Sequence, residues 1–193
     1  MTFRKMVPVL ALSVAASFLN ACASDQSTQS PLLAQLTQAR ATWDAAKATC
    51  TTYHYNNEHQ HFPFGGCSKD AIEITDDQPT KRRGYGGAVG ACADAVEVEW
   101  EETSAAIGSH AGGVAALTVE QLFADCQRSL AADPAMYELK LVVGPMGVPS
   151  TCGTVPKNCA DDCFTGFDLT DFACGSLPPS PPPSPPIDGG AHD

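Results

Sequence analysis

Two stretches of the chain place their apolar residues at the three- and four-residue steps of a helix. In the first, Pro31 follows Ser30 as a first helical residue follows an N-cap. Its apolar positions are Leu32, Leu33, Leu36, Ala39, Trp43, Ala46 and Cys50. The second begins with Thr118-Val-Glu-Gln121, which has the form of a capping box, and carries an apolar stripe at Val119, Leu122, Phe123, Cys126 and Leu130. The pattern predicts helices over 31–48 and from 118 to near 133, where Pro134 disfavours further helix.

The remaining apolar positions alternate with polar ones, as in strands that bury one face. The runs are Tyr53 and Tyr55; Ile72 and Ile74; Val96, Val98 and Trp100; Tyr137, Leu139, Leu141 and Val143; Phe167 and Leu169. Turn residues at 76–79 and 144–147 separate such runs, which favours antiparallel hairpins. We therefore predict an α+β fold, in which an antiparallel sheet carries two helices packed on one face.

The two ends of the chain follow neither pattern. Residues 1–21 run from two cations through an apolar stretch to small residues, which is the order of a secretory signal peptide. The apolar stretch has about 14 residues, whereas a helix needs roughly 20 to cross the hydrocarbon core. Residues 22–30 form a polar tether, and the proline-rich residues 176–193 form an extended, disordered tail. One domain, residues 31–175, lies between them.

The segment Leu19-Asn20-Ala21-Cys22 resembles the lipobox of bacterial lipoproteins. That resemblance implies that Cys22 carries a diacylglyceryl group and becomes the first residue of the mature chain. The alternative is ordinary signal-peptide cleavage after Ala21 or Ala23. Both predict export, and lipidation of Cys22 predicts a protein of the cell envelope that is anchored to a membrane.

The chain has nine cysteines, so they cannot all form disulfides with one another. A lipid on Cys22 would leave eight, an even number that can pair completely. The other eight are candidates for four disulfides in an oxidising compartment: Cys50, Cys67, Cys92, Cys126, Cys152, Cys159, Cys163 and Cys174. The sequence does not choose among the 105 possible pairings. A zinc site that uses Cys159 and Cys163 is the competing interpretation.

The net charge of the chain limits the classes of molecule that it can bind. From Cys22 onward the chain keeps nine of its eleven Lys and Arg and all 22 Asp and Glu, so its formal charge is −13. Such a surface repels nucleic acid, and we expect no nucleic-acid partner. The single basic run, Lys81-Arg82-Arg83, reads as a solvated strand edge.

Candidate chemistry is sparse. His54, His59 and His61 are ligand types for zinc or copper, but His54 has the opposite strand parity, so the three converge only across a turn. An exposed hairpin tip is the alternative. Ser109 and His110 lie in a glycine-rich loop that would hold a nucleophile if the fold supplied a carboxylate. Signatures of hydrolases are missing, so we predict no enzyme and no cofactor.

Several short motifs, in order, resemble those of a family of exported bacterial domains, the domain-of-unknown-function family 6174. They are Trp43, Tyr53-His-Tyr55, Thr118-Val-Glu-Gln-Leu-Phe123, Gly147-Val-Pro149, Ala160 to Asp162, and the strand from Phe167 to Phe172. The resemblance covers about residues 36 to 173. It implies export and a fold, and it brings no activity or catalytic residue with it.

Three hypotheses follow. The first is a non-catalytic envelope lipoprotein that binds or scaffolds an envelope partner. The second is a periplasmic metal-binding protein that uses His54, His59 and His61. The third is a hydrolase with Ser109 or His110.

Overall fold

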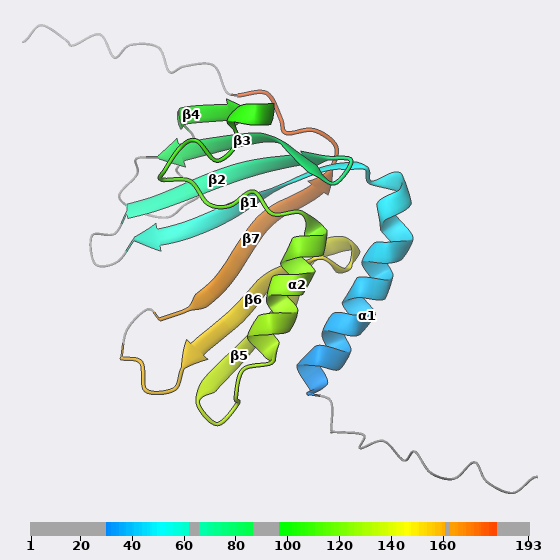
Figure 1. Ribbon diagram of the computed structural model, residues 1–193, viewed down its shortest axis with the longest axis vertical. Helices are drawn as coiled ribbons and strands as arrows, with labels where there is room; N and C mark the ends of the chain where they lie inside the picture. The colour runs from blue at the N-terminus through cyan, green and yellow to red at the C-terminus, as the bar shows by residue number, and fades with distance from the viewer. Residues whose placement is uncertain (1–29, 62–65, 87–96, 161–162, 181–193) are drawn as a thin grey trace, which may run out of the picture.

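Seven antiparallel strands form one sheet in the computed structural model, which describes residues 30–61, 66–86, 97–160 and 163–180 (Figure 1). The strands are β1 (Thr52–His61), β2 (Gly66–Thr75), β3 (Gln78–Gly86), β4 (Glu97–Thr103), β5 (Tyr137–Val143), β6 (Pro149–Pro156) and β7 (Thr165–Cys174). The helices are α1 (Pro31–Ala46) and α2 (Val119–Leu130). Short 3₁₀ turns follow α1 at Lys47–Thr49, β4 at Ser104–Ala106 and β5 at Pro145–Gly147. The predicted α+β fold is confirmed.

The order of the strands is β4-β3-β2-β1-β7-β6-β5. The strands β2 and β3 are joined through Asp76 and Asp77, both at positive φ, which is the type I′ turn that matches strand twist. The last strand, β7, enters the middle of the sheet beside the first (Figure 1). The first and last strands of the domain are therefore hydrogen-bonded neighbours.

Both helices begin as the sequence predicts. The capping box of α2 is complete, since Gln121 N donates to Thr118 Oγ1 at 3.3 Å and Thr118 N donates to Gln121 Oε1 at 2.8 Å. Pro31 occupies the first turn of α1. The helix α2 ends at Leu130, three residues before the predicted end, because Asp133 already starts a turn in which its carbonyl accepts from Met136 N.

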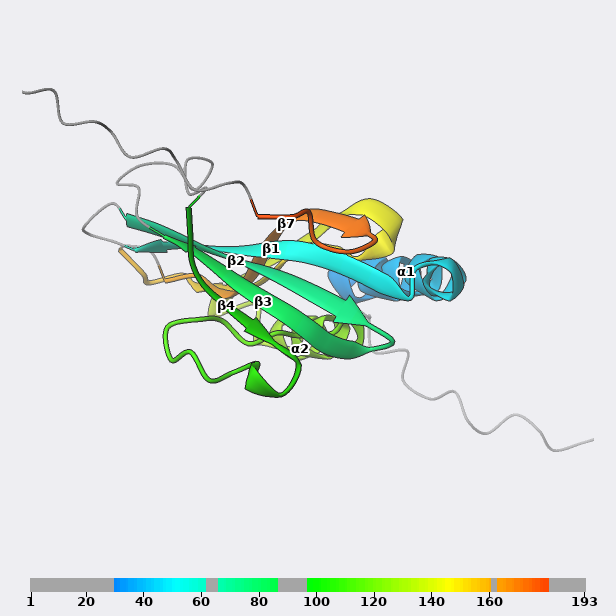
Figure 2. The ribbon, with the colours of Figure 1, turned by 90° about the horizontal axis from the view of Figure 1, so that it is seen from above.

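The core lies between the two helices and one face of the sheet. Figure 2 shows α2 and the loop that leads into it on the same side of the strands. The fully buried side chains include Trp43 from α1, Leu122 from α2, and Tyr53, Tyr55 and Ile72 from the sheet. The hydroxyls of both tyrosines form hydrogen bonds with the backbone at the start of α2. Tyr53 Oη accepts from Val119 N at 3.0 Å, and Tyr55 Oη donates to the carbonyl of Leu117 at 2.6 Å.

Three disulfides join described cysteines: Cys50–Cys174, Cys126–Cys152 and Cys159–Cys163. The first connects the end of the α1 region to the end of β7, and the second fixes α2 to β6. The third uses the pair that the zinc interpretation assigned to a metal. Cys22, Cys92 and the side chain of Cys67 lie outside the described residues, so the pairing of Cys67 and Cys92 and the lipid on Cys22 stay predictions.

The first residues of the predicted tail lie on the domain. Residues 175–180, which we call the strap, cross the face of the sheet opposite α2. Leu177 is 9% exposed and its N–H donates to Glu73 Oε2 at 2.8 Å, while Arg83 Nη1 donates to the carbonyl of Pro178 at 3.0 Å. One apolar side chain and two hydrogen bonds thus hold the first residues of the expected tail on the domain. Residues 181–193 lie outside the described part.

Candidate functional site

The structure describes only part of the histidine cluster that the metal hypothesis uses. The strand β1 runs from Thr52 to His61 without a turn, so the backbone between His54 and His59 lacks the bend that would bring the three together. His54 Nδ1 donates to the carbonyl of Gly175 at 2.9 Å. The side chains of His59 and His61 lie outside the described residues. Within the described residues, no three His, Cys, Asp or Glu side chains gather to hold a metal ion.

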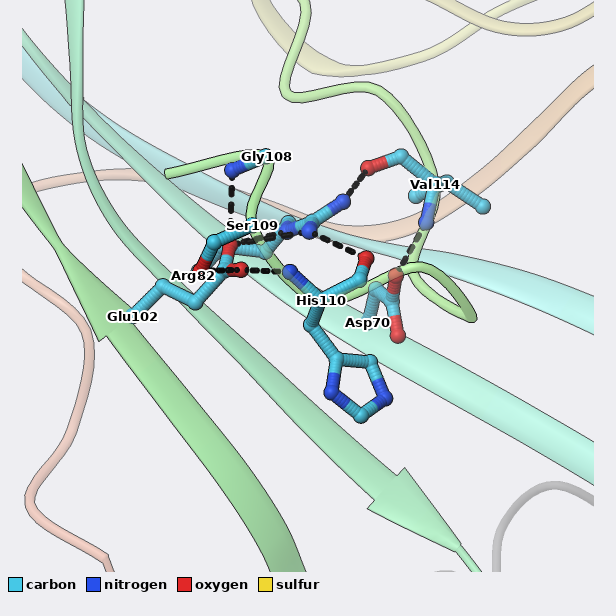
Figure 3. Close-up of polar contacts among 7 residues, drawn as sticks. All are labelled: Asp70, Arg82, Glu102, Gly108, Ser109, His110 and Val114. Atoms are coloured by element: carbon cyan, nitrogen blue, oxygen red, sulfur yellow. Dashed lines mark hydrogen bonds and ion pairs between the residues drawn. The ribbon is translucent and has the colours of Figure 1, made fainter. Parts of the chain in front are cut away.

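Among the described residues, a dense polar cluster lies where β3 and β4 meet the loop before α2 (Figure 3). Arg82 and Glu102 are 2% and 5% exposed, and they form an ion pair with Nη2–Oε2 at 2.8 Å and Nε–Oε2 at 2.9 Å. The same carboxylate accepts from Gly108 N at 2.9 Å, from Ser109 Oγ at 2.9 Å and from His110 N. One buried carboxylate therefore holds three consecutive residues of the loop.

The guanidinium group of Arg82 holds the same loop from its other side. It donates to the carbonyl of His110 at 3.1 Å and to the carbonyl of Val114. Asp70 on β2 completes the attachment, since its Oδ2 accepts from Val114 N at 2.5 Å. The loop is thus fixed by charged side chains from three adjacent strands.

Aromatic packing covers this cluster. The rings of Trp100 and His110 stack with centroids 4.2 Å apart, and the guanidinium carbon of Arg82 lies 4.9 Å from the Trp100 ring. Glycine is required at two positions here. A Cβ on Gly84 would lie 2.1 Å from the Trp100 ring, and one on Gly113 would lie 2.7 Å from both Arg82 and Trp100. The indole therefore lies directly on the backbone of β3 and of the loop.

The protonation of Glu102 follows from these contacts. Burial opposes its charged form, but the N–H groups of Gly108 and His110, the Ser109 hydroxyl and Arg82 outweigh burial and lower its pKa to about 2. A carboxylate that stays charged in this way is a poor acceptor of a proton from serine at neutral pH. The fold does supply the carboxylate that the hydrolase hypothesis required, but the Ser109 hydroxyl donates to it and the His110 ring stacks on Trp100.

The basic run is a correction to the sequence interpretation. Lys81-Arg82-Arg83 is not a solvated edge, because β3 lies inside the sheet with β2 on one side and β4 on the other. Arg82 faces the loop, and Arg83 is 4% exposed on the opposite face, where its guanidinium pairs with Glu101 at 2.7 Å. Each arginine is buried beside a glutamate of β4, with Glu102 pairing Arg82 on one face and Glu101 pairing Arg83 on the other.

A hollow of about 280 Å³ opens between α1 and α2. We call it the helix groove. Its lining residues are Leu33, Leu36, Thr37, Arg40, Glu120, Phe123, Ala124 and Gln127. Leu36 and Phe123 also belong to the core, so the floor of the groove is the apolar surface between the two helices.

One end of the groove carries a balanced set of charges. Arg40 contacts Glu120 across the two helices, and its guanidinium carbon lies 5.0 Å from the centre of the Phe123 ring. Lys47 lies 3.5 Å from the Glu120 carboxylate and 3.0 Å from that of Asp44. The charges of these two cations and two anions cancel. The groove therefore combines an apolar floor with hydrogen-bonding groups that carry no net charge.

Comparisons of the chain with models of protein families, with curated proteins and with solved structures find no match. Among the residues that the structure describes, no helix is long and apolar enough to cross a membrane. Function is therefore inferred from the chain's own residues and their geometry.

Proposed function

We propose that the protein is a lipid-anchored, non-catalytic binding module of the cell envelope, and that the helix groove is its ligand site. The observation that carries the proposal is the composition of this groove. Leu33, Leu36 and Phe123 give it an apolar floor, while Arg40 and Glu120 end it with paired charges. Concave sites with an apolar lining and a few polar groups are the usual form of small-molecule sites.

The use of the polar cluster supports a binding role over a catalytic one. Both carboxylate oxygens of Glu102 already accept hydrogen bonds, from Arg82 and from three donors of the loop. A general base needs a free acceptor within hydrogen-bond reach of the group that it activates. In this cluster the contacts serve to attach the loop, and the loop in turn leads into the first turn of α2, which borders the groove.

The ligand class follows from size and charge. About 280 Å³ is small for such a site, so the ligand is a single short apolar chain or ring. The charges at the end of the groove are already paired with one another, and the mature chain is strongly acidic. An anionic head group would therefore be disfavoured, and we infer a small amphiphile with an uncharged hydrogen-bonding head.

The expected anchor places the groove close to a source of such molecules. Pro31 is nine positions after Cys22. Nine residues span at most about 30 Å when fully extended. Leu33 and Thr37, in the first two turns of α1, therefore stay within a short distance of the membrane that would hold Cys22.

The test uses full-length protein in its membrane and a photoreactive decanol that carries a diazirine group. After irradiation, mass spectrometry should find label concentrated in the peptides that contain Leu33 and Phe123. Ala124→Trp fills the groove from an exposed position of α2 and should reduce this label about tenfold, as expected for a loss of 1.4 kcal/mol in binding.

Arg128→Trp is the matched control, because Arg128 lies on the same helix, is exposed and does not line the groove. It should leave the labelling unchanged. Equal labelling of the Ala124→Trp protein and the natural protein, or label spread evenly over the surface, would reject the groove as the site.

A further inference from the structure

The two edges of the sheet differ in a way that selects one of them for pairing. The strands β4 and β5 end the sheet, and no other described strand pairs with their outer sides. Glu97, Glu99 and Glu101 are exposed along β4, and an acidic edge of this kind repels a second copy of itself. The edge at β5 has no such run of like charge, since its exposed charged residues are one acidic and one basic, Glu138 and Lys140.

Exposed apolar side chains collect at β5. Among the described residues, the large hydrophobic side chains that stand out in solvent are Met136, Tyr137 and Val142, which are 61%, 37% and 53% exposed. All three lie on β5 or on the residue before it. Leu139 and Leu141 between them are half-buried and pack against the core. The solvent face of this edge therefore has apolar side chains, Met136 and Val142, at either end of the charged residues Glu138 and Lys140.

The sequence of the edge is complementary to itself. When two copies are aligned antiparallel about Leu139, Glu138 of each lies opposite Lys140 of the other, and Met136 lies opposite Val142. Directly opposite residues in antiparallel strands interact most strongly, and opposite charges and apolar pairs both stabilise the pairing. Tyr137 then lies opposite Leu141 on the face that packs toward the helices.

The direction of the backbone groups agrees with this register. Lys157 N donates to the carbonyl of Met136, so the even-numbered positions of β5 direct their backbone groups toward β6. Alternate residues of a strand direct these groups to opposite sides, so Tyr137, Leu139 and Leu141 offer theirs to the open edge. With a twofold axis at Leu139, the two copies of Leu139 would lie opposite each other as a hydrogen-bonded pair. Glu138 and Lys140 would then form the non-hydrogen-bonded pairs, in which side chains approach more closely.

We propose that β5 pairs with β5 of a second copy, centred on Leu139, and joins two sheets into one. The twofold axis is perpendicular to the sheet, so α1 and α2 of both copies lie on the same side. One strand pair buries less than a standard protein interface, so the dimer is weak in dilute solution. Confinement of both copies to one membrane raises their effective concentration and favours it.

The test exchanges charges between copies. Full-length protein is labelled enzymatically at the C-terminus with a donor or an acceptor dye and placed in liposomes. The natural protein should give energy transfer that unlabelled protein competes away. Lys140→Glu and Glu138→Lys each place like charges opposite one another. With either variant alone, the energy transfer should therefore fall to the level given by random proximity in the membrane.

A mixture of donor-labelled Lys140→Glu with acceptor-labelled Glu138→Lys should recover the transfer, because every opposed pair again has opposite charges. The ion pair within one strand, where Lys140 Nζ lies 3.7 Å from Glu138 Oε1, cannot produce this recovery. Glu99→Lys on β4 is the control and should behave as the natural protein does. Transfer that persists in the single variants, or a mixture that fails to recover, overturns the proposal.

Discussion

Glu102→Gln should detach the loop of residues 104–117 and destabilise the whole domain. The substitution keeps the size of the side chain but replaces one carboxylate oxygen with an NH₂ group, which donates and does not accept. At least one loop donor then faces another donor. Arg82, 2% exposed, is left as a buried cation without its anion. Carbonyl contacts to His110 and Val114 remain, but they do not neutralise the charge.

The expected loss is about 3–5 kcal/mol, which is typical when one partner of a buried ion pair is removed. That is a large share of the 5 to 15 kcal/mol that stabilise a whole domain. Glu101→Gln is the matched control on the same strand. Glu101 lies on the opposite face, its side chain is 37% exposed, and its partner Arg83 keeps the carbonyl of Pro178. Arg83 also loses its anion in this control, but Glu101 holds no donor of the loop and is partly screened by solvent, so Glu101→Gln should lose less stability than Glu102→Gln.

Urea unfolding followed by tryptophan fluorescence measures both variants, because the chain has two tryptophans, with Trp43 in the core and Trp100 in the cluster. The pH dependence gives an independent check. The pKa of Glu102 is lowered from 4.5 to about 2, so its stabilising effect is complete above pH 4.5 and is lost as the pH falls toward 2. The natural protein should lose stability over this range more steeply than Glu102→Gln does.

Two outcomes would refute the reasoning. If Glu102→Gln costs no more than Glu101→Gln, the cluster does not hold the loop. If both proteins lose stability in parallel between pH 4.5 and 2, the carboxylate of Glu102 is not the group that titrates there. Hydrogen exchange in residues 104–117 should rise in Glu102→Gln, and unchanged exchange would contradict local detachment in the same way.

Two further predictions concern the cysteines. Cys22→Ser should release the protein from membranes or block its maturation, and fractionation identical to that of the natural protein would reject the lipid anchor. The double variant Cys50→Ser with Cys174→Ser should lower the midpoint of urea unfolding more than the double variant Cys159→Ser with Cys163→Ser. The chain-entropy estimate is about 5 kcal/mol for the first loop and about 2 kcal/mol for the second, since their cysteines are 124 and 4 positions apart. Equal losses would show that loop length does not set the contribution.

The elements of the fold were predictable because their signals are local. The capping box at Thr118 and the stripe from Val119 to Leu130 are confirmed as α2. The strand face at Tyr53 and Tyr55 is buried as predicted. Each of these patterns repeats within a few residues and depends little on distant parts of the chain.

The arrangement of those elements was not predictable from the same signals. That β7 pairs with β1, and that Cys50 is bonded to Cys174, are contacts between residues more than 100 positions apart. No periodicity in a single sequence records which distant segments meet. For the same reason the sequence does not determine which cysteines pair.

The polar cluster was missed although part of its signal was present. The alternation of β4 runs through Val98 and Trp100 and then reaches Glu102, which the pattern places on the buried face. A charged residue is seldom buried unless it is paired, so a sequence interpretation reads such a position as solvent-exposed. Its partner, Arg82, is set by the register of β3 against β4, and the sequence does not display that register.

The disulfide between Cys50 and Cys174 also determines how the domain would respond to tension. A pull applied between the start of α1 and the end of the strap would travel through α1, cross the sulfur–sulfur bond and leave through the strap. The sheet and α2 lie outside this covalent path and would be loaded only through their contacts with α1 and the strap. The strap, held by Leu177 and by the hydrogen bond to Pro178, would peel first, and α1 would follow. Because α1 forms one wall of the helix groove, stretching would open the groove while the rest of the domain stayed folded.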